Sequence, residues 1–227
     1  MAEEPRVTPS VTMIHTVSSL VAPFTALASE LLPDTDVFHV VDESLLTQTR
    51  RAGRITPLTR RRLLGYAMAA DELGVSAILV TCSSVGPVVD LARPFLNATI
   101  LRVDEAMADE AIGHGPRIGV LATLQSTLEP TRDLIVDRAA AAGLPAEVSA
   151  TLCDGAFEAV TVGDVDRHDA LVRAGLLGLA ATNDIIVLAQ ASMARVVGNL
   201  GNERPSIPIL SSPRLAVERL RAVLSGV

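Results

Sequence analysis

The stretch Ala77-Ile-Leu-Val-Thr-Cys-Ser-Ser-Val-Gly-Pro87 contains an apolar run that ends in a thiol, two hydroxyls and a glycine. The apolar run predicts a buried strand over residues 77–81, and the small polar residues after it predict the start of a helix. In open α/β sheets, ligands bind at the carboxyl ends of the strands. Cys82 is therefore a candidate reactive residue, although a free cysteine is also often a small and inert core residue.

The composition favours a parallel sheet covered by helices. The chain has 227 residues, of which 49% are hydrophobic and only 2% aromatic, so Val, Ile, Leu and Ala must form the core. The net charge of -7 argues against nucleic acid and anionic membranes as partners. No apolar run approaches a membrane span, and the segment from Met1 to Arg6 lacks the features of a signal peptide. We therefore expect a cytoplasmic protein.

Several kinds of cofactor site have no support in the sequence. The chain contains no lysine, which excludes the Schiff base that anchors pyridoxal phosphate. Cys82 and Cys153 lack the spacing of a zinc site, and no His/Asp/Glu cluster has metal-ligand spacing. Gly113 and Gly115, which with Gly119 resemble a glycine-rich loop, precede a predicted strand, whereas a phosphate-binding loop follows one. We expect no cofactor and no metal.

Strands and helices alternate along the whole chain, which predicts an α/β fold with parallel pairing. Helices are expected over residues 56–73, 127–142, 168–181 and 213–224. The expected strands are residues 11–17, 37–41, 77–81 and 99–103, followed by 117–122, 146–152, 185–189 and 207–210.

The two sets of strands form an internal repeat. The second four strands begin 106, 109, 108 and 108 residues after the first four. The repeat predicts two pseudo-symmetric lobes over residues 1–110 and 111–227. Each lobe should hold a four-stranded, mainly parallel sheet flanked by helices, with the active site in the cleft between them. No Pro/Gly/Ser-rich linker separates the lobes, so we expect them to be tightly joined, with terminal elements free to cross over.

Small polar residues gather where the predicted strands end. Hydroxyls and free backbone N–H groups at helix starts form an anion pocket without a cationic side chain, although the same residues also cap helices. Four such clusters at equivalent places predict a site for a small carboxylate. The candidate binding residues are Ser18, Ser83, Ser84, Thr123, Ser126, Thr127, Gln190 and Ser192.

This layout resembles the aspartate/glutamate/hydantoin racemase superfamily, which also includes maleate isomerase and arylmalonate decarboxylase. The stretch Thr81-Cys-Ser-Ser84 is similar to the first-lobe Cys-Asn-Thr signature. The stretch Val187-Leu-Ala-Gln-Ala-Ser-Met193 is similar to the second-lobe motif of hydantoin racemases. The resemblance implies chemistry without a cofactor at the α-carbon of a small carboxylate or amino-acid derivative. It also implies a cysteine from each lobe beside that carbon, and a homo-oligomer.

The sequence departs from the family pattern at Gln190, which stands where the second cysteine is expected. A glutamine amide does not titrate near neutral pH, so it cannot serve as the second base. Cys153 is the only other thiol, and it is either a second acid/base or a packing residue.

Three functions therefore stay open. The first is a racemase that uses Cys82 with an unusual second base such as Cys153. The second is a single-thiol decarboxylase or cis-trans isomerase. The third is a non-catalytic binding protein for small molecules on the same scaffold.

Overall fold

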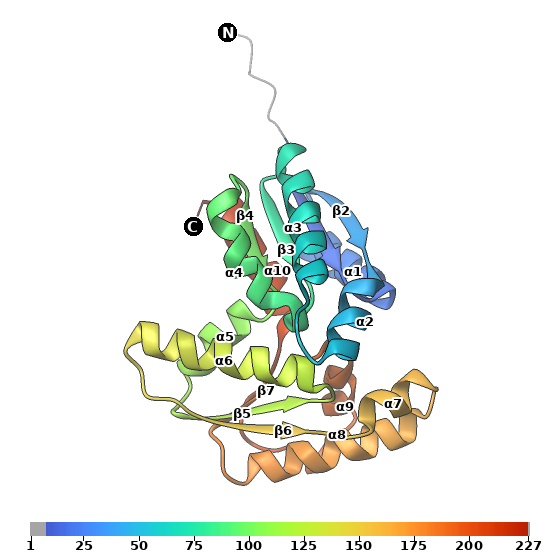
Figure 1. Cartoon of the computed structure of the whole chain (residues 1–227). Coiled ribbons are helices and arrows are strands. Elements are labelled where there is room, and N and C mark those ends of the chain that lie inside the picture. Colours follow the sequence, from blue (N-terminus) through green and yellow to red (C-terminus); the bar gives the residue numbers. More distant parts are fainter. Residues whose placement is uncertain (1–7, 227) are drawn as a thin grey trace.

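A computed structural model describes residues 8–226 and shows two lobes, each built on a four-stranded sheet (Figure 1). The N-terminal segment 1–6, on which the expectation against a signal peptide rests, lies outside the described residues. All strand pairs are parallel, in the order β2-β1-β3-β4 and then β6-β5-β7-β8, so the predicted fold and repeat are confirmed. The strands are β1 (Ser10–His15), β2 (Asp36–Val41), β3 (Ala77–Val80), β4 (Thr99–Arg102), β5 (Arg117–Ala122), β6 (Glu147–Leu152), β7 (Ile185–Leu188) and β8 (Ile209–Ser211).

Helices cover both faces of each sheet (Figure 1). Helices α1 (Val21–Leu31) and α10 (Ser212–Leu224) pack on one face of the first sheet. Helices α2 (Glu43–Ala52), α3 (Pro57–Glu72) and α4 (Gly86–Ala92) pack on the other face. In the second lobe, α5 (Glu105–Ile112) and α6 (Gln125–Ala142) cover one face. The opposite face is covered by α7 (Ala156–Thr161), α8 (Val165–Ala180) and α9 (Ala194–Gly198). Among the helices of residues 8–226, none combines the length and apolar character that a membrane crossing requires.

Several strands end earlier than the apolar pattern predicts. The first strand was expected to reach Val17, but β1 ends at His15, and β3 ends one residue before Thr81. Thr16, Val17 and Thr81 continue the apolar and β-branched pattern in sequence. They lie beyond the last residues of β1 and β3 and are not part of either strand. Helix α8 begins at Val165, before the expected His168, because the Asp164 side chain accepts a hydrogen bond from the N–H of Arg167.

The last helix of each repeat packs against the other lobe. Helix α5 follows β4, yet its Met107 and Ala108 lie in the core of the second sheet. Helix α10 follows β8, yet its Val217 and Leu220 are fully buried in the core of the first sheet. The lobe boundary predicted at residue 110 falls inside α5. The hydrophobic cores of the two lobes therefore depend on each other.

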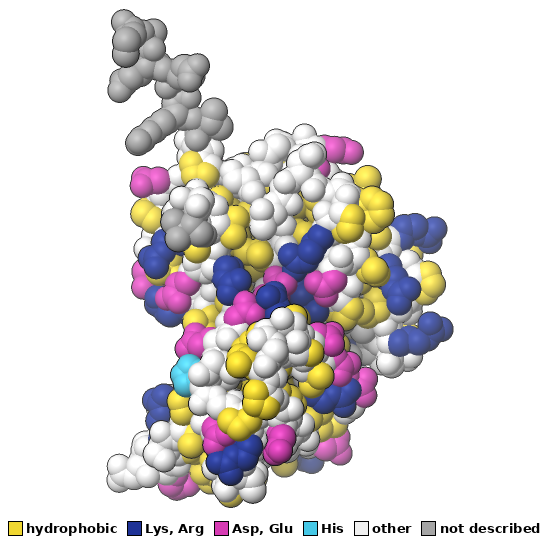
Figure 2. All heavy atoms as spheres, turned by 90° about the vertical axis from the view of Figure 1, so that its left-hand side faces the viewer, with side chains coloured by type: hydrophobic (Ala, Val, Ile, Leu, Met, Phe, Trp, Pro, Cys, Tyr) yellow, Lys and Arg dark blue, Asp and Glu magenta, His cyan; other side chains and the backbone are white. Residues whose placement is uncertain are grey.

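An ion-pair cluster joins the lobes at the waist of the molecule, where Figure 2 shows acidic and basic side chains side by side. Its centre is Arg102, which is only 4% exposed and bonds both carboxylate oxygens of Asp104 (3.0 and 3.1 Å). The Arg102 guanidinium also contacts Asp90 and the carbonyl of Pro130 in α6. A Cβ at Gly86 would lie 2.5 Å from Arg102 Nε, so the glycine of the opening stretch makes room for this guanidinium.

We expect Arg102→Leu to lower the free energy of unfolding by about 3–5 kcal/mol, because it leaves the fully buried Asp104 without its partner. Asp90→Asn should cost less than about 1 kcal/mol, because the Asp90 side chain is 49% exposed and solvent screens its charge. Urea unfolding of both variants and the wild type measures the difference. Equal losses in the two variants would contradict a dominant role for the buried pair.

Candidate active site

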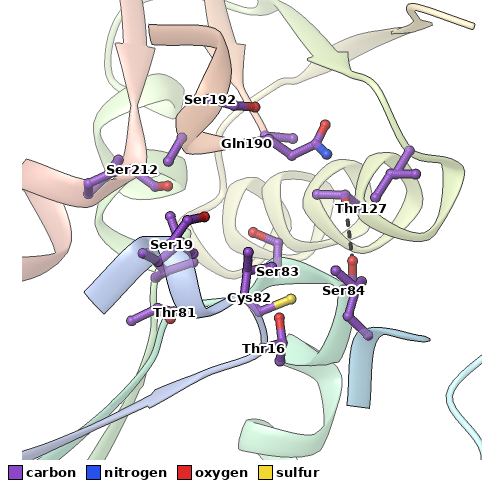
Figure 3. Close-up of a pocket in the computed structure, with 18 of the residues that line it drawn as sticks. Thr16, Ser19, Thr81, Cys82, Ser83, Ser84, Thr127, Gln190, Ser192 and Ser212 are labelled. Carbon is purple, nitrogen blue, oxygen red and sulfur yellow. Dashed lines mark hydrogen bonds between the residues drawn. The ribbon is translucent and has the colours of Figure 1, made fainter. Parts of the chain in front are cut away.

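A cavity of about 390 Å³ lies between the lobes, at the carboxyl ends of both sheets (Figure 3). Because the strands of each sheet are parallel, their carboxyl ends lie at one edge, and the two edges face each other. The first lobe contributes Thr16, Val17, Ser19, Leu20, Phe24, Leu46, Thr81, Cys82, Ser83, Ser84 and Val103. The second half of the chain contributes Leu124, Thr127, Phe157, Val160, Thr161, Ala189, Gln190, Ala191, Ser192, Ser212 and Pro213.

The cavity includes six of the residues that the sequence singled out. They are Cys82, Ser83, Ser84, Thr127, Gln190 and Ser192. Ser18 lies outside the lining because its N–H and Oγ both donate to Glu43 Oε1, and its neighbour Ser19 lines the cavity instead. Ser126 also lies outside the lining, with its Oγ 3.4 Å from Ser84 Oγ.

Cys153 lies in the core of the second lobe and does not line the cavity. Its side chain is 5% exposed and packs against Gly175, where an added Cβ would be 2.9 Å from the sulfur. Burial raises the pKa of Cys153 to about 11. This environment is that of a packing residue, with no hydrogen-bond donor available to stabilise a thiolate.

Five polar residues of the lining were absent from the sequence-based candidates: Thr16, Ser19, Thr81, Thr161 and Ser212. Thr161 is the last residue of α7 and does not follow a strand. Thr16 and Thr81 were counted as strand residues, although each directly follows the last residue of a strand. Ser212 follows β8 and obeys the same strand-end rule as the residues that were chosen. The rule is that polar residues just after a parallel strand face the ligand-binding edge, and its application to the eighth strand would have identified Ser212.

The Cys82 thiol is held at the start of a short 3-10 helix, Ser83–Val85. The N–H groups of Ser84 and Val85 and the hydroxyls of Thr16 and Ser84 lie near the sulfur, where they lower the pKa of Cys82 and favour a thiolate. Burial opposes them and is the larger effect, so the pKa of Cys82 is raised above its ordinary value. The Thr16 hydroxyl is buried and has no hydrogen-bond partner among the described residues. Cys82 therefore rests as a protonated thiol.

Thr81 is oriented by a buried histidine. His15 Nδ1 lies 2.9 Å from Thr81 Oγ1, and His15 Nε2 lies 2.9 Å from His39 Nδ1. Burial, together with the neighbouring His39, lowers the pKa of His15 to about 4. The imidazole is therefore neutral at pH 7 and adds no charge to this wall of the cavity.

Gln190 forms part of the opposite wall (Figure 3). Its Oε1 accepts hydrogen bonds from the Thr123 N–H (2.6 Å) and the Thr123 hydroxyl (2.9 Å). Thr123 itself does not line the cavity, so its role is to orient the amide. With Oε1 occupied, the Nε2 group of Gln190 remains as a hydrogen-bond donor for a ligand.

Two sets of contacts join the lobes around the cavity. Ser84 Oγ and Thr127 Oγ1 lie 2.8 Å apart, which links the Cys82 segment to the start of α6. Arg50 of α2 lies over the ring of Phe157 in α7 at 4.1 Å, and its Nη2 is 3.7 Å from Glu158. The cation–π contact holds Phe157 as a wall of the cavity.

The lining is polar but uncharged. Among the described residues that line the cavity, Cys82 carries the only group that titrates, and the lining has no arginine, carboxylate or histidine. Nor does any group of three or more His, Cys, Asp or Glu suited to a metal ion occur within residues 8–226. Hydroxyls, the Gln190 amide and the Cys82 thiol are the polar side-chain groups of the described lining, beside apolar walls from residues such as Phe24 and Phe157.

Comparisons with known proteins agree with this arrangement. A family model described as Asp/Glu/Hydantoin racemase matches residues 12–220. No curated protein matches the sequence significantly. Among solved structures, an allantoin racemase from Klebsiella pneumoniae has a TM-score of 0.69 at 19% identity, covering 96% of this chain and 88% of that chain.

Two other solved structures show the same fold. A glutamate racemase from Bacillus anthracis has a TM-score of 0.71 at 14% identity, covering 96% of this chain and 82% of that one. An aspartate racemase from Picrophilus torridus also has a TM-score of 0.71, at 11% identity, covering 96% and 94% of the two chains. At these identities the likeness concerns the fold alone.

The raised pKa of Cys82 predicts how its alkylation by iodoacetamide depends on pH. Because only the thiolate reacts, the rate should still be rising above pH 8.5, where an ordinary cysteine of pKa about 8.5 is half ionised. Thr16→Val should raise this pKa further, since it removes a hydroxyl that favours the thiolate. Mass spectrometry of the alkylated peptides separates Cys82 from Cys153. A midpoint well below 8.5 at Cys82 would show a resting thiolate and contradict this assignment.

Proposed function

This chain belongs to the Asp/Glu/hydantoin racemase family, and from that premise we propose that it transfers a proton at the α-carbon of a small carboxylate through Cys82. The family match extends over residues 12–220 and therefore includes both walls of the cavity. We propose that the reaction needs no cofactor. Location in the cytoplasm and assembly into a homo-oligomer stay predictions.

One observation supports this proposal most directly: Cys82 is the only titratable group in the cavity lining, and it rests as a thiol. A thiol can give its proton to the α-carbon of an enediolate, leaving a thiolate that then takes a proton from solvent. The Gln190 amide and the hydroxyls of Ser83 and Ser192 would donate hydrogen bonds to the enediolate oxygens. Such preorganised donors are typically worth roughly a few kcal/mol each in the transition state.

The lining also bears on the substrate. A free amino acid carries an ammonium group, and no carboxylate of the described lining can pair with it. Burying an unpaired charge is costly, so a substrate without an ammonium group fits better. A carboxylate with an apolar substituent, or an amino-acid derivative whose nitrogen is acylated or cyclised, would bury that substituent against Leu20, Phe24 and Phe157.

A racemase and a single-thiol enzyme differ in whether they need a second acid/base on the side of the α-carbon opposite Cys82. Racemisation needs a second group that removes or delivers a proton opposite Cys82. Gln190 occupies that wall and Cys153 is buried in the core. This favours, as the second candidate function, an enzyme that needs one thiol. In a decarboxylase Cys82 would deliver a proton to one face of the enediolate left after loss of CO2. In a cis-trans isomerase the Cys82 thiolate would add to the double bond and leave again after rotation about the resulting single bond. A non-catalytic binding protein would bind the same carboxylates without turnover.

We expect a substrate screen in D2O to separate these functions. The panel would hold hydantoins, N-acyl amino acids, substituted malonates, maleate, and free aspartate and glutamate. Deuterium at the α-carbon with loss of optical rotation indicates a racemase. Net conversion indicates a single-thiol enzyme: a decarboxylase if a malonate loses CO2, with a single enantiomer where a stereocentre forms, and a cis-trans isomerase if maleate becomes fumarate. Preferred turnover of free aspartate or glutamate would contradict the argument from the uncharged lining.

Cys82→Ala should lower turnover by about a thousandfold or more, since it removes the only titratable group among the described residues of the lining. Cys153→Ala is the matched control and should retain activity, because Cys153 lies outside the cavity. Calorimetric titration with the best ligand shows whether Cys82→Ala still binds. If ligand binding is intact and the wild type turns over nothing in the panel, the protein is a binding protein.

Gln190→Cys tests the missing second thiol. The substitution places a thiol 108 residues after Cys82, at the equivalent point after β7. If Gln190 is what prevents two-sided proton transfer, the variant should exchange the substrate α-hydrogen with D2O at least about tenfold faster than the wild type. Gln190→Ser is the control, because it also removes the amide but adds no thiol. Equal exchange in the two variants would show that a second thiol at this position is insufficient.

A further inference from the structure

A run of arginines begins beside the cavity, at Arg50, and has no role in the chemistry described above. Residues 50–62 contain six arginines and no acidic residue, in a chain whose net charge is -7. All six side chains are exposed. The run includes the end of α2, the turn after it and the first turns of α3.

The position of this run in the fold brings it beside residues that line the cavity. Helix α2 begins just after the carboxyl end of β2, and its Leu46 lines the cavity. One turn later, Arg50 reaches Phe157 in α7, which lines the cavity from the other lobe. Arg62 of α3 returns to Asp42 at the end of β2, with 2.8 Å between Nη2 and Oδ2. Figure 1 shows α2 and α7 on the same side of the molecule.

Two of the six arginines are partly neutralised by acids, Arg62 by Asp42 and Arg50 by Glu158. The other four form no ion pair within the described chain; we call them the rim arginines. They are Arg51, Arg54, Arg60 and Arg61. By contrast, the arginines at the waist, such as Arg102 and Arg138, are paired with carboxylates. No acidic side chain among residues 8–226 pairs with the positive charge of the rim arginines.

A positive rim matters because the cavity lining itself has no cation. An anionic ligand approaching an acidic protein is repelled on average, and a local patch of the opposite sign reverses this along one path. Charges act over about 8–10 Å at physiological ionic strength, so the field of a rim extends beyond contact distance. A cationic rim with neutral hydrogen-bond donors inside attracts a carboxylate without holding it in an ion pair.

We propose that the four rim arginines recruit small organic anions to the cavity and so favour carboxylate ligands over neutral ones. This inference rests on the carboxylate of the proposed function, but it does not depend on which reaction follows. A single-stranded nucleic acid is a less suitable occupant of this surface, because the chain has few aromatic side chains on which bases could stack.

Cys82 itself provides the probe for this proposal. Iodoacetate is an anion and iodoacetamide is neutral, and both alkylate the same thiolate, so the ratio of their rates cancels any change in the pKa of Cys82. The variant Arg51→Gln/Arg54→Gln/Arg60→Gln/Arg61→Gln removes the rim arginines. The control Arg132→Gln/Arg173→Gln/Arg204→Gln/Arg221→Gln changes the net charge equally elsewhere on the surface.

In the wild type, the iodoacetate-to-iodoacetamide ratio at Cys82 should fall as ionic strength rises from about 0.01 M to about 0.5 M. In the rim variant, the ratio at low ionic strength should be at least about threefold below the wild type and nearly insensitive to salt. The control variant should behave as the wild type does. Circular dichroism and thermal unfolding confirm that both variants are folded.

An unchanged ratio in the rim variant overturns the proposal, and so does an equal fall in the control, which would show an effect of net charge alone. DNA binding by the wild type that the rim variant loses, with the ratio unchanged, would assign the surface to a macromolecule and also overturns it. The measurement needs no turnover. If the protein turns over nothing in the D2O screen but shows the expected alkylation ratios, the proposed reaction is refuted and the recruitment of anions by the rim arginines is still supported.

Discussion

Each lobe contributes one helix to the hydrophobic core of the other lobe, and the geometry of the cavity depends on this mutual packing. Helix α5 buries Met107 and Ala108 against the second sheet, and α10 buries Val217 and Leu220 against the first. Separating the lobes would expose these side chains to water, at a cost of roughly 1.5–3 kcal/mol for each large one. The edges at which both sheets end therefore face each other at a fixed distance, and a cavity can persist between them.

The waist, the cavity lining and the rim differ in the charge that they carry. The waist holds paired ions such as Arg102 and Asp104, where an unpaired charge would be costly. The cavity lining holds neutral hydrogen-bond donors and one thiol, and burial keeps that thiol protonated. Unpaired positive charge occurs at the exposed rim, where water screens it. An anion that enters meets hydrogen-bond donors whose strength increases because little water competes with them.

Some features of the site follow from local sequence, and others do not. The strand-end rule found six lining residues because a helix start after a parallel strand always faces the ligand edge. The rule chose Ser18 over Ser19 wrongly for the lining, because a 3-10 turn points Ser18 toward Glu43. It could not show that Thr16 lies beside Cys82, since the two follow different strands and meet only when β1 pairs with β3.

The sequence by itself determined the alternation of strands and helices, the repeat, the two lobes, and the thiol that lacks a partner at Gln190, because these depend on periodicity and spacing along the chain. Tertiary structure alone decided that Cys153 packs against Gly175, that α5 and α10 cross between lobes, and that Cys82 rests as a thiol. The physical reason is that burial and desolvation are set by residues distant in sequence. A pKa or a side-chain direction therefore cannot be read from local pattern.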